Sequence, residues 1–251
     1  MRFQNKRVLI TGAGSGIGRA AARLMAQEGA EIAFTYHRNE SGAKELEKEL
    51  IPFGRTILPF RVDMTQDRQI VKLAEWIGER WDSVDILINN AGGLVERMMF
   101  FEITKEKWDE IMALNLWSVF LLSQKIGALM KEHGGGVIVN NASVAGRFGG
   151  GAGALAYSTA KGALITMTQA MGRELIPHNI RVNALAPGLI DTPFHERFTS
   201  PELLQSLLSR VPINRMGTPE EMAKVILFLA SEDSSYLVGA TIDANGGMWV
   251  I

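Results

Sequence analysis

The sequence of 251 residues contains no cysteine. This absence excludes disulfides, thiolate nucleophiles and zinc sites built on cysteine. The four histidines (His37, His133, His178 and His195) are scattered without the paired spacing of metal ligands, so we expect no metal site. Neither sign of charge dominates, since 26 lysines and arginines stand against 27 acidic residues. Recruitment of nucleic acid by a general electrostatic field is therefore not expected.

Long hydrophobic runs are also scarce. No window approaches the roughly 20 apolar residues that a membrane helix needs. The N-terminal stretch MRFQNKRVLITG enters a predicted strand at once, without the apolar stretch of a signal peptide. We therefore expect a cytoplasmic protein with no membrane partner. A chain of this length, with 47% hydrophobic residues, is sufficient for one domain with a full core, spanning residues 1–251.

Short apolar runs alternate with helical periodicity along the chain. The predicted strands are 7–11, 31–36, 56–62, 84–88, 137–141, 180–185 and 240–243. The predicted helices are 17–25, 41–50, 65–81, 104–130, 157–176 and a segment that begins at Pro219. This alternation predicts one α/β domain in which helices cover both faces of a parallel sheet.

The segment 189–217 departs from the alternation. It contains three prolines and lacks clean periodicity, and its leucines at 203–208 predict one short helix. Long excursions after a strand at the ligand edge of a sheet are typically lids. We predict a mobile substrate lid here.

A glycine-rich turn separates the first predicted strand from the first helix. Its glycines, Gly12, Gly16 and Gly18, have the spacing GxxxGxG. Backbone N–H groups and the positive end of a helix bind phosphate in this context. The acid that would bind a ribose 2′-hydroxyl is missing after the second strand, where His37 and Arg38 could instead face a 2′-phosphate. We predict NADP as the preferred cofactor and NAD as the alternative. The other interpretation is that His37 and Arg38 lie on a solvated loop and bind no cofactor.

Three side chains could together move a proton to or from a substrate oxygen. Tyr157 and Lys161 are four residues apart and share one helix face, and Ser143 follows a predicted buried strand. A nearby cation favours the phenolate and lowers the pKa of a tyrosine from about 10. The serine hydroxyl could hold a carbonyl oxygen within reach of the same phenol. The alternative is a helix with one buried aromatic and one surface lysine.

Asparagines mark two other positions. Asn89 and its successors Asn-Ala-Gly92 follow the fourth predicted strand, at the edge of a parallel sheet where ligands bind. Asn115 lies within an apolar helix face, and a buried amide needs a partner. It could bond the backbone or hold a water that relays protons, and both readings stay open.

The chain resembles a compact short-chain dehydrogenase/reductase over essentially its whole length. The resemblance rests on ordered motifs: TGAGSGIG at 11–18, Asp63, NNAG at 89–92, Asn115, Ser143, YSTAK at 157–161 and PG at 187–188. It implies a single Rossmann-type doubly wound domain with seven mostly parallel strands. It also implies hydride transfer between a nicotinamide and a carbonyl or alcohol carbon, and a homotetramer paired through long helices.

The resemblance assigns roles to the matching residues. Tyr157 would be the acid/base, Ser143 would hold the substrate oxygen, Asn115 would seat a relay water, and Lys161 would tune Tyr157 and hold the nicotinamide ribose. The expected cofactor-binding residues are Gly12, Ser15, Gly16, Ile17, Gly18, His37, Arg38, Asp63, Met64, Asn89, Ala91, Gly92, Tyr157, Lys161, Pro187, Gly188, Ile190 and Thr192.

The substrate prediction depends on basic residues near the expected mouth of the site, namely Arg97, Arg147, His195 and Arg197. Such a cluster could clamp a carboxylate, and we predict substrate binding by Ser143, Arg147, Tyr157 and His195. The runs NNAGGLVER and DTPFHERF are similar to bacterial keto-uronate reductases, which implies a small polar keto-sugar or keto-acid. The alternative is a 3-oxoacyl thioester, because the chain is also similar to 3-oxoacyl-carrier-protein reductases. A regulator without catalysis and an epimerase or dehydratase remain as further readings.

Overall fold

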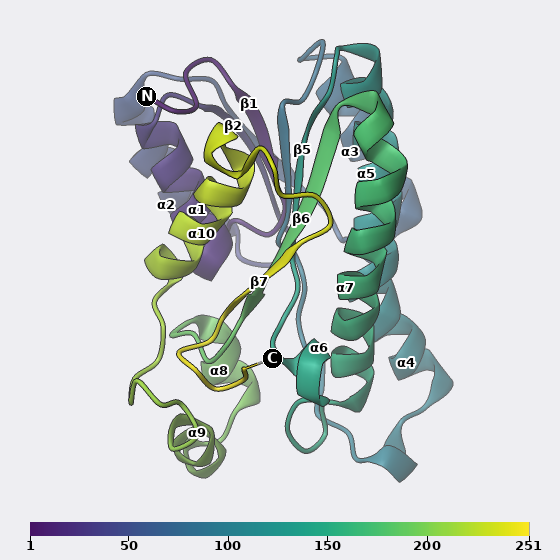
Figure 1. The fold of residues 1–251 in the computed structure, drawn as a ribbon, viewed down its shortest axis with the longest axis vertical. Coiled ribbons are helices and arrows are strands. Elements are labelled where there is room, and N and C mark those ends of the chain that lie inside the picture. Colours follow the sequence, from purple (N-terminus) through teal and green to yellow (C-terminus); the bar gives the residue numbers. More distant parts are fainter. Residues whose placement is uncertain (251) are drawn as a thin grey trace.

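The computed structural model describes residues 1–250 and contains a seven-stranded sheet (Figure 1). All neighbouring strands are parallel, in the order β3-β2-β1-β4-β5-β6-β7. The strands are β1 (Arg7–Ile10), β2 (Glu31–Tyr36), β3 (Ile57–Arg61), β4 (Ile86–Asn89), β5 (Gly136–Asn141), β6 (Ile180–Pro187) and β7 (Thr241–Ala244). The predicted doubly wound α/β class is confirmed, and the direction of chain growth reverses between β1 and β4.

Helices form a layer on each face of the sheet (Figure 1). One layer holds α1 (Gly16–Gln27), α2 (Glu40–Leu50) and α10 (Pro219–Ala230). The other holds α3 (Asp67–Gly78), α5 (Ser118–Glu132) and α7 (Leu155–Leu175). Short 3₁₀ turns occur at η1 (Ile51–Phe53), η2 (Phe100–Glu102), η4 (Ile176–His178) and η5 (Glu232–Ser234). Helix α1 packs against α10 and α3 packs against α5.

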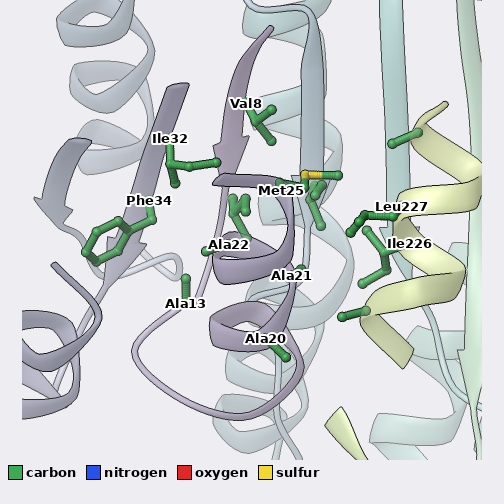
Figure 2. Close-up of a cluster of buried hydrophobic side chains, with 14 of the residues drawn as sticks. Val8, Ala13, Ala20, Ala21, Ala22, Met25, Ile32, Phe34, Ile226 and Leu227 are labelled. Carbon is green, nitrogen blue, oxygen red and sulfur yellow. The ribbon is translucent and has the colours of Figure 1, made fainter. Parts of the chain in front are cut away.

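The core on the α1 side is built from small residues on the helix and large ones on the sheet. Figure 2 shows this cluster, whose labelled members are Val8, Ala13, Ala20, Ala21, Ala22, Met25, Ile32, Phe34, Ile226 and Leu227. The alanines let α1 lie close to both the sheet and α10. Each large side chain buried here contributes about 1.5–3 kcal/mol. This close packing fixes the start of α1, and therefore the glycine turn before it.

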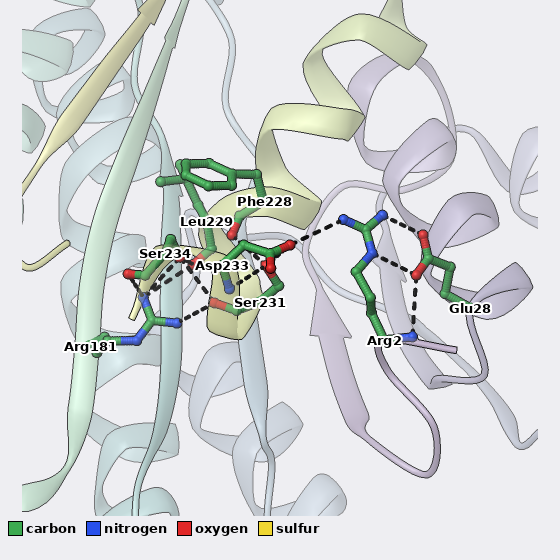
Figure 3. A network of polar contacts seen from close by, with 8 residues as sticks. All are labelled: Arg2, Glu28, Arg181, Phe228, Leu229, Ser231, Asp233 and Ser234. Carbon is green, nitrogen blue, oxygen red and sulfur yellow. Dashed lines mark hydrogen bonds and ion pairs between the residues drawn. The ribbon is translucent and has the colours of Figure 1, made fainter. Parts of the chain in front are cut away.

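A buried arginine ties the C-terminal end of α10 to the sheet (Figure 3). Arg181 of β6 donates from Nη2 to the Ser231 carbonyl at 2.8 Å and from Nη1 to the Ser234 carbonyl at 3.0 Å. Burial lowers the pKa of Arg181, although the Glu232 carboxylate opposes this. A cation is favourable at a helix C-terminus, where the last carbonyls lack partners within the helix.

The long helix predicted at 104–130 is interrupted. It consists of α4 (Lys105–Met112), a π-helical turn η3 (Ala113–Trp117) and α5. By length and composition, Lys105–Glu132 is also apolar enough to cross a membrane. This corrects the expectation that no window approaches such composition. Leu121, Leu122 and Ile126 are buried in the cluster against the sheet, as in the core helix of a folded domain.

The predicted lid contains two short helices rather than one. These are α8 (Pro193–Phe198) and α9 (Pro201–Leu208), and a parallel bridge between Ile190 and Gly217 closes the base. Helix α6 (Ala145–Phe148) was also not predicted. Both lid helices begin with a proline after a hydroxyl residue, a start signal that the sequence does contain.

Candidate active site

A cavity of about 410 Å³ lies at the C-terminal ends of the strands. It extends from the glycine turn and the ends of β2 and β3, across the reversal between β1 and β4, to the lid. Ligands bind at this position in open parallel sheets. The predicted residues that line it are Gly12, Ser15, Gly16, Ile17, His37, Asp63, Met64, Ala91, Gly92, Ser143, Tyr157, Lys161, Pro187, Gly188, Ile190, Thr192 and His195.

The glycine turn has the backbone that a phosphate site requires. Gly12 and Gly16 have φ of +69° and +56°, and a Cβ on Gly12 would lie 2.9 Å from the Ala91 Cα. Ser15 caps α1 without a side-chain bond to it, and the first turn carries no acidic residue. The free N–H groups in the first turn of α1 and the positive end of its dipole therefore favour the binding of an anion. These residues fit the phosphates of a dinucleotide.

Three predicted cofactor residues do not line the cavity. A Cβ on Gly18 would lie 2.6 Å from the Gly12 carbonyl, so Gly18 packs behind the turn. Arg38 is exposed and is not among the residues that line the cavity, although its charge acts on Asp63. Asn89 is buried on the opposite side of β4, where its Nδ2 donates to Ser123 Oγ and Asn140 Oδ1, both at 2.9 Å. Its side chain therefore gives no support to the expected contact with the adenine ribose, because alternate strand residues face opposite sides.

Asn90 lines the cavity in place of Asn89. Its Nδ2 donates to the carbonyls of Thr11 and Gly12 at 3.0 Å, and its Oδ1 accepts from Asn141 Nδ2 at 2.9 Å. Asn141 also lines the cavity, so the two amides connect the glycine turn to the end of β5. Our sequence analysis named Asn90 only as part of the NNAG run and did not name Asn141, although β4 and β5 each end in an asparagine pair whose alternation places one amide on each face.

The three predicted catalytic side chains converge at one end of the cavity. Lys161 is only 4% exposed; its Nζ donates to the Asn141 carbonyl at 2.7 Å and lies 5.8 Å from the centroid of the Tyr157 ring. Burial lowers the pKa of Lys161 to about 8. Burial raises the pKa of Tyr157, and a hydrogen bond with Ser143 opposes this. Lys161 is not a cause of this shift in the protein alone, and the expected lowering of the Tyr157 pKa by its charge stays a prediction.

Asn115 bonds the backbone. It lies in η3 and donates from Nδ2 to the carbonyls of Ile111 at 2.9 Å and Gly93 at 2.8 Å, while its Oδ1 accepts from the Gly93 N–H at 3.0 Å. Both amide hydrogens are used and Asn115 does not line the cavity, so its side chain gives no support to the predicted water relay. A Cβ on Gly92 would lie 2.9 Å from its Oδ1, so Asn115 helps fix the turn after β4. Single π-helical turns are frequent near functional sites.

The predicted cluster of basic residues is largely dispersed. Arg147 pairs with Asp243 (Nη2 to Oδ2, 3.0 Å) and does not line the cavity, so the geometry gives no support to the expectation that it binds substrate. Arg197 is exposed, with its guanidinium 5.0 Å from the centroid of the Phe198 ring. Arg97 and His195 do line the cavity. Burial, with the Arg97 charge as a smaller cause, lowers the pKa of His195, so this imidazole is neutral at pH 7.

The substrate end of the cavity also has an apolar wall that the sequence analysis missed. The ring of Phe194, from the lid, lies 6.0 Å from that of Tyr157, measured between centroids. The other large apolar residues here are Leu94, Val144, Phe148, Leu207 and Met248. Together with Phe194 they come from five separate segments, since Val144 and Phe148 both belong to α6 and its N-cap, and apolar residues scattered in this way carry no recognisable spacing.

Comparisons with known proteins agree with this geometry. The family model described as "Enoyl-(Acyl carrier protein) reductase" matches residues 12–249. The chain is 38% identical to a 3-oxoacyl-[acyl-carrier-protein] reductase of Thermotoga maritima, over 99% of each chain, and 35% identical to that of Escherichia coli, over 100% of each. A solved short-chain type dehydrogenase/reductase from Mycobacterium marinum superposes with a TM-score of 0.93 and 33% identity, covering 99% of this chain and 97% of that one.

Proposed function

Since the chain belongs to the short-chain dehydrogenase/reductase family, we propose that it reduces the ketone of a 3-oxoacyl thioester with NADPH. Family membership makes it an oxidoreductase that acts on CH–OH groups. The observation that carries the proposal is the meeting of Ser143, Tyr157 and Lys161 in a cavity whose glycine turn fits a dinucleotide.

A bound nicotinamide would supply the hydride. Gly12, Ser15 and Gly16 would hold its phosphates, and Lys161 would hold a ribose. The Tyr157 hydroxyl would donate the proton to the ketone oxygen, and the Ser143 hydroxyl would hold that oxygen in reach. Burial raises the pKa of Tyr157, so the phenol carries its proton at neutral pH, as the reduction direction requires.

Two findings support a thioester substrate. Relatives that match this chain over 99–100% of its length are named 3-oxoacyl-[acyl-carrier-protein] reductases. The wall formed by residues such as Phe148, Phe194 and Met248 suits an acyl chain better than a sugar. The small polar keto-acid or keto-sugar remains a second candidate, because the basic residues Arg97 and His195 line the cavity. Among the described residues, the one acidic residue that lines the cavity is Asp63, at the cofactor end.

The NADP preference rests on the cofactor end of the cavity. No acidic residue ends β2, and His37 lines the cavity with its Nε2 3.7 Å from Asp63 Oδ2. Partial burial would raise the pKa of Asp63, but bonds from Thr65 and the charges of His37 and Arg38 outweigh it and lower that pKa. Asp63 is therefore ionised, and a 2′-phosphate would depend on His37 to offset it.

The test follows NADPH oxidation with three ketones side by side: acetoacetyl–acyl-carrier protein, a keto-uronate and a neutral keto-sugar. We expect the thioester to have the highest kcat/KM, and NADPH to exceed NADH about tenfold, as one charge-assisted contact to a phosphate provides. A higher value with the keto-uronate would move the proposal to the second candidate. No turnover with any ketone would contradict it.

A further inference from the structure

Arg97 joins the two walls that bound the substrate end of the cavity. It lies in the connection between β4 and η2, and its side chain lines the cavity. Its Nε donates to the Phe198 carbonyl at 2.5 Å, at the last residue of lid helix α8. Its Nη1 donates to the Ala152 carbonyl at 2.7 Å, in the glycine-rich loop 149–153. One side chain therefore spans from the lid to the loop.

Both walls are short segments without a fully buried residue. In the loop, Gly149, Gly150 and Gly153 have φ of +88°, +74° and +73°, and helix α8 has six residues, none of them fully buried. Segments with few buried contacts open at a low free-energy cost. The Arg97 backbone is itself fixed beside the loop, because the Met98 N–H donates to the Gly153 carbonyl at 3.2 Å. The two Arg97 bonds thus connect the lid to the loop through one side chain.

The acceptors of Arg97 are uncharged. Within residues 1–250, no carboxylate lies at ion-pair distance from its guanidinium. Bonds from a charged donor to carbonyls hold firmly, yet water can replace those carbonyls when the walls separate. An ion pair buried in the same place would leave an unpaired acid on opening. Hydrogen bonds of this kind are therefore suited to form when the lid and the loop approach each other and to break when they separate.

We propose that Arg97 is a specificity-determining residue that latches the lid to the loop 149–153 over the bound substrate. This inference rests on the proposed carbonyl reduction. A small free keto acid fits within the closed walls, whereas a thioester on a carrier protein keeps its arm between them and requires the latch to open. Arg97 therefore favours small ketones over carrier-bound ones.

Two readouts test the latch. Arg97→Met keeps the side-chain length and removes every donor, and Arg97→Lys keeps the charge. The matched control is Arg197→Met, because Arg197 lies on α8, is exposed, and contacts the neighbouring Phe198 ring rather than the loop 149–153. In the protein without ligands, we expect hydrogen exchange at 150–153 and 194–199 to quicken about tenfold in Arg97→Met and to stay unchanged in the control.

The second readout is the ratio of kcat/KM for acetoacetyl–acyl-carrier protein to that for free acetoacetate. We expect Arg97→Met to raise this ratio about tenfold, with Arg97→Lys between it and the wild type. Unchanged exchange, or equal loss with both substrates, would overturn the latch while leaving the proposed function intact. If the wild type reduces neither ketone, the proposed function fails, and the exchange measurement still decides the latch.

Discussion

Tyr157 is the one group at the substrate end whose chemistry no neighbour can replace. Its hydroxyl would give the proton, whereas most of the expected cofactor contacts would come from other residues that line the cavity. Tyr157→Phe should reduce kcat by about 10²–10⁴-fold, as removal of a general acid does. NADPH affinity, measured by fluorescence titration, should stay close to that of the wild type. A variant that retains a tenth or more of the wild-type rate would contradict the assignment.

The buried charge of Lys161 should lower the free energy of unfolding at neutral pH. Its pKa is about 8 in the folded protein against 10.5 as the reference, so folding favours the neutral amine. Between these values the unfolded chain binds more protons, and stability should rise with pH from about 8 to about 10.5. The full penalty, about 3 kcal/mol, applies below pH 8.

Lys161→Met therefore should be more stable than the wild type at pH 7, by up to about 3 kcal/mol, although catalytically inactive. Urea unfolding at several pH values measures this. The variant should also lose the rise in stability above pH 8. Equal stability at pH 7 would show that the bond from Lys161 Nζ to the Asn141 carbonyl compensates the buried charge.

At the scale of elements, Figure 3 shows a buried arginine, Arg181, and an exposed one, Arg2, whose contributions to stability can be compared. Arg181 is 8% exposed and bonds carbonyls at the end of α10, whereas Arg2 is largely exposed and pairs with Glu28. Arg181→Met leaves buried carbonyls without donors and should cost about 2–5 kcal/mol. Arg2→Met should cost about 1 kcal/mol or less. Urea unfolding of both variants decides; equal costs would mean that α10 is held by its apolar face alone.

The regular elements could be predicted because helices buried on one face show a helical period, whereas strands covered on both faces appear as short apolar runs. All seven strands and the six long helices follow from these two patterns, with ends that differ by a few residues. The turn η3 could not be predicted, because a single π-helical turn leaves the apolar pattern of 104–130 intact. Helices α6 and α8 were missed because elements of four and six residues are too short to show a period.

The same reasoning explains the site. Ser143, Tyr157 and Lys161 could be predicted because they follow a strand and share a helix face, which are local properties. The fate of Arg147 could not, because its partner Asp243 lies 96 residues away. The NNAG motif contains both Asn89 and Asn90, so the motif alone cannot tell which amide faces the cavity. The pleat of β4 decides this, and our prediction named Asn89.

At the scale of the whole molecule, the helix Lys105–Glu132 leaves apolar side chains uncovered. Trp117 is 46% exposed and Phe120 is 37% exposed, with ring centroids 5.4 Å apart. Contiguous exposed apolar groups on a folded domain often mark an interface. A second copy of the chain on this helix would agree with the predicted homotetramer, which stays a prediction here.

We expect light scattering after size exclusion to give a mass of four times 27.5 kDa for the wild type. Replacing both Trp117 and Phe120 by Glu would place charges in the interface, where an unpaired buried charge is costly, and should yield smaller species. Ile51→Glu is the control, since Ile51 is 61% exposed on η1 beside α2. It should keep the wild-type mass. A monomeric wild type, or a double variant of unchanged mass, would show that these aromatic side chains do not hold subunits together.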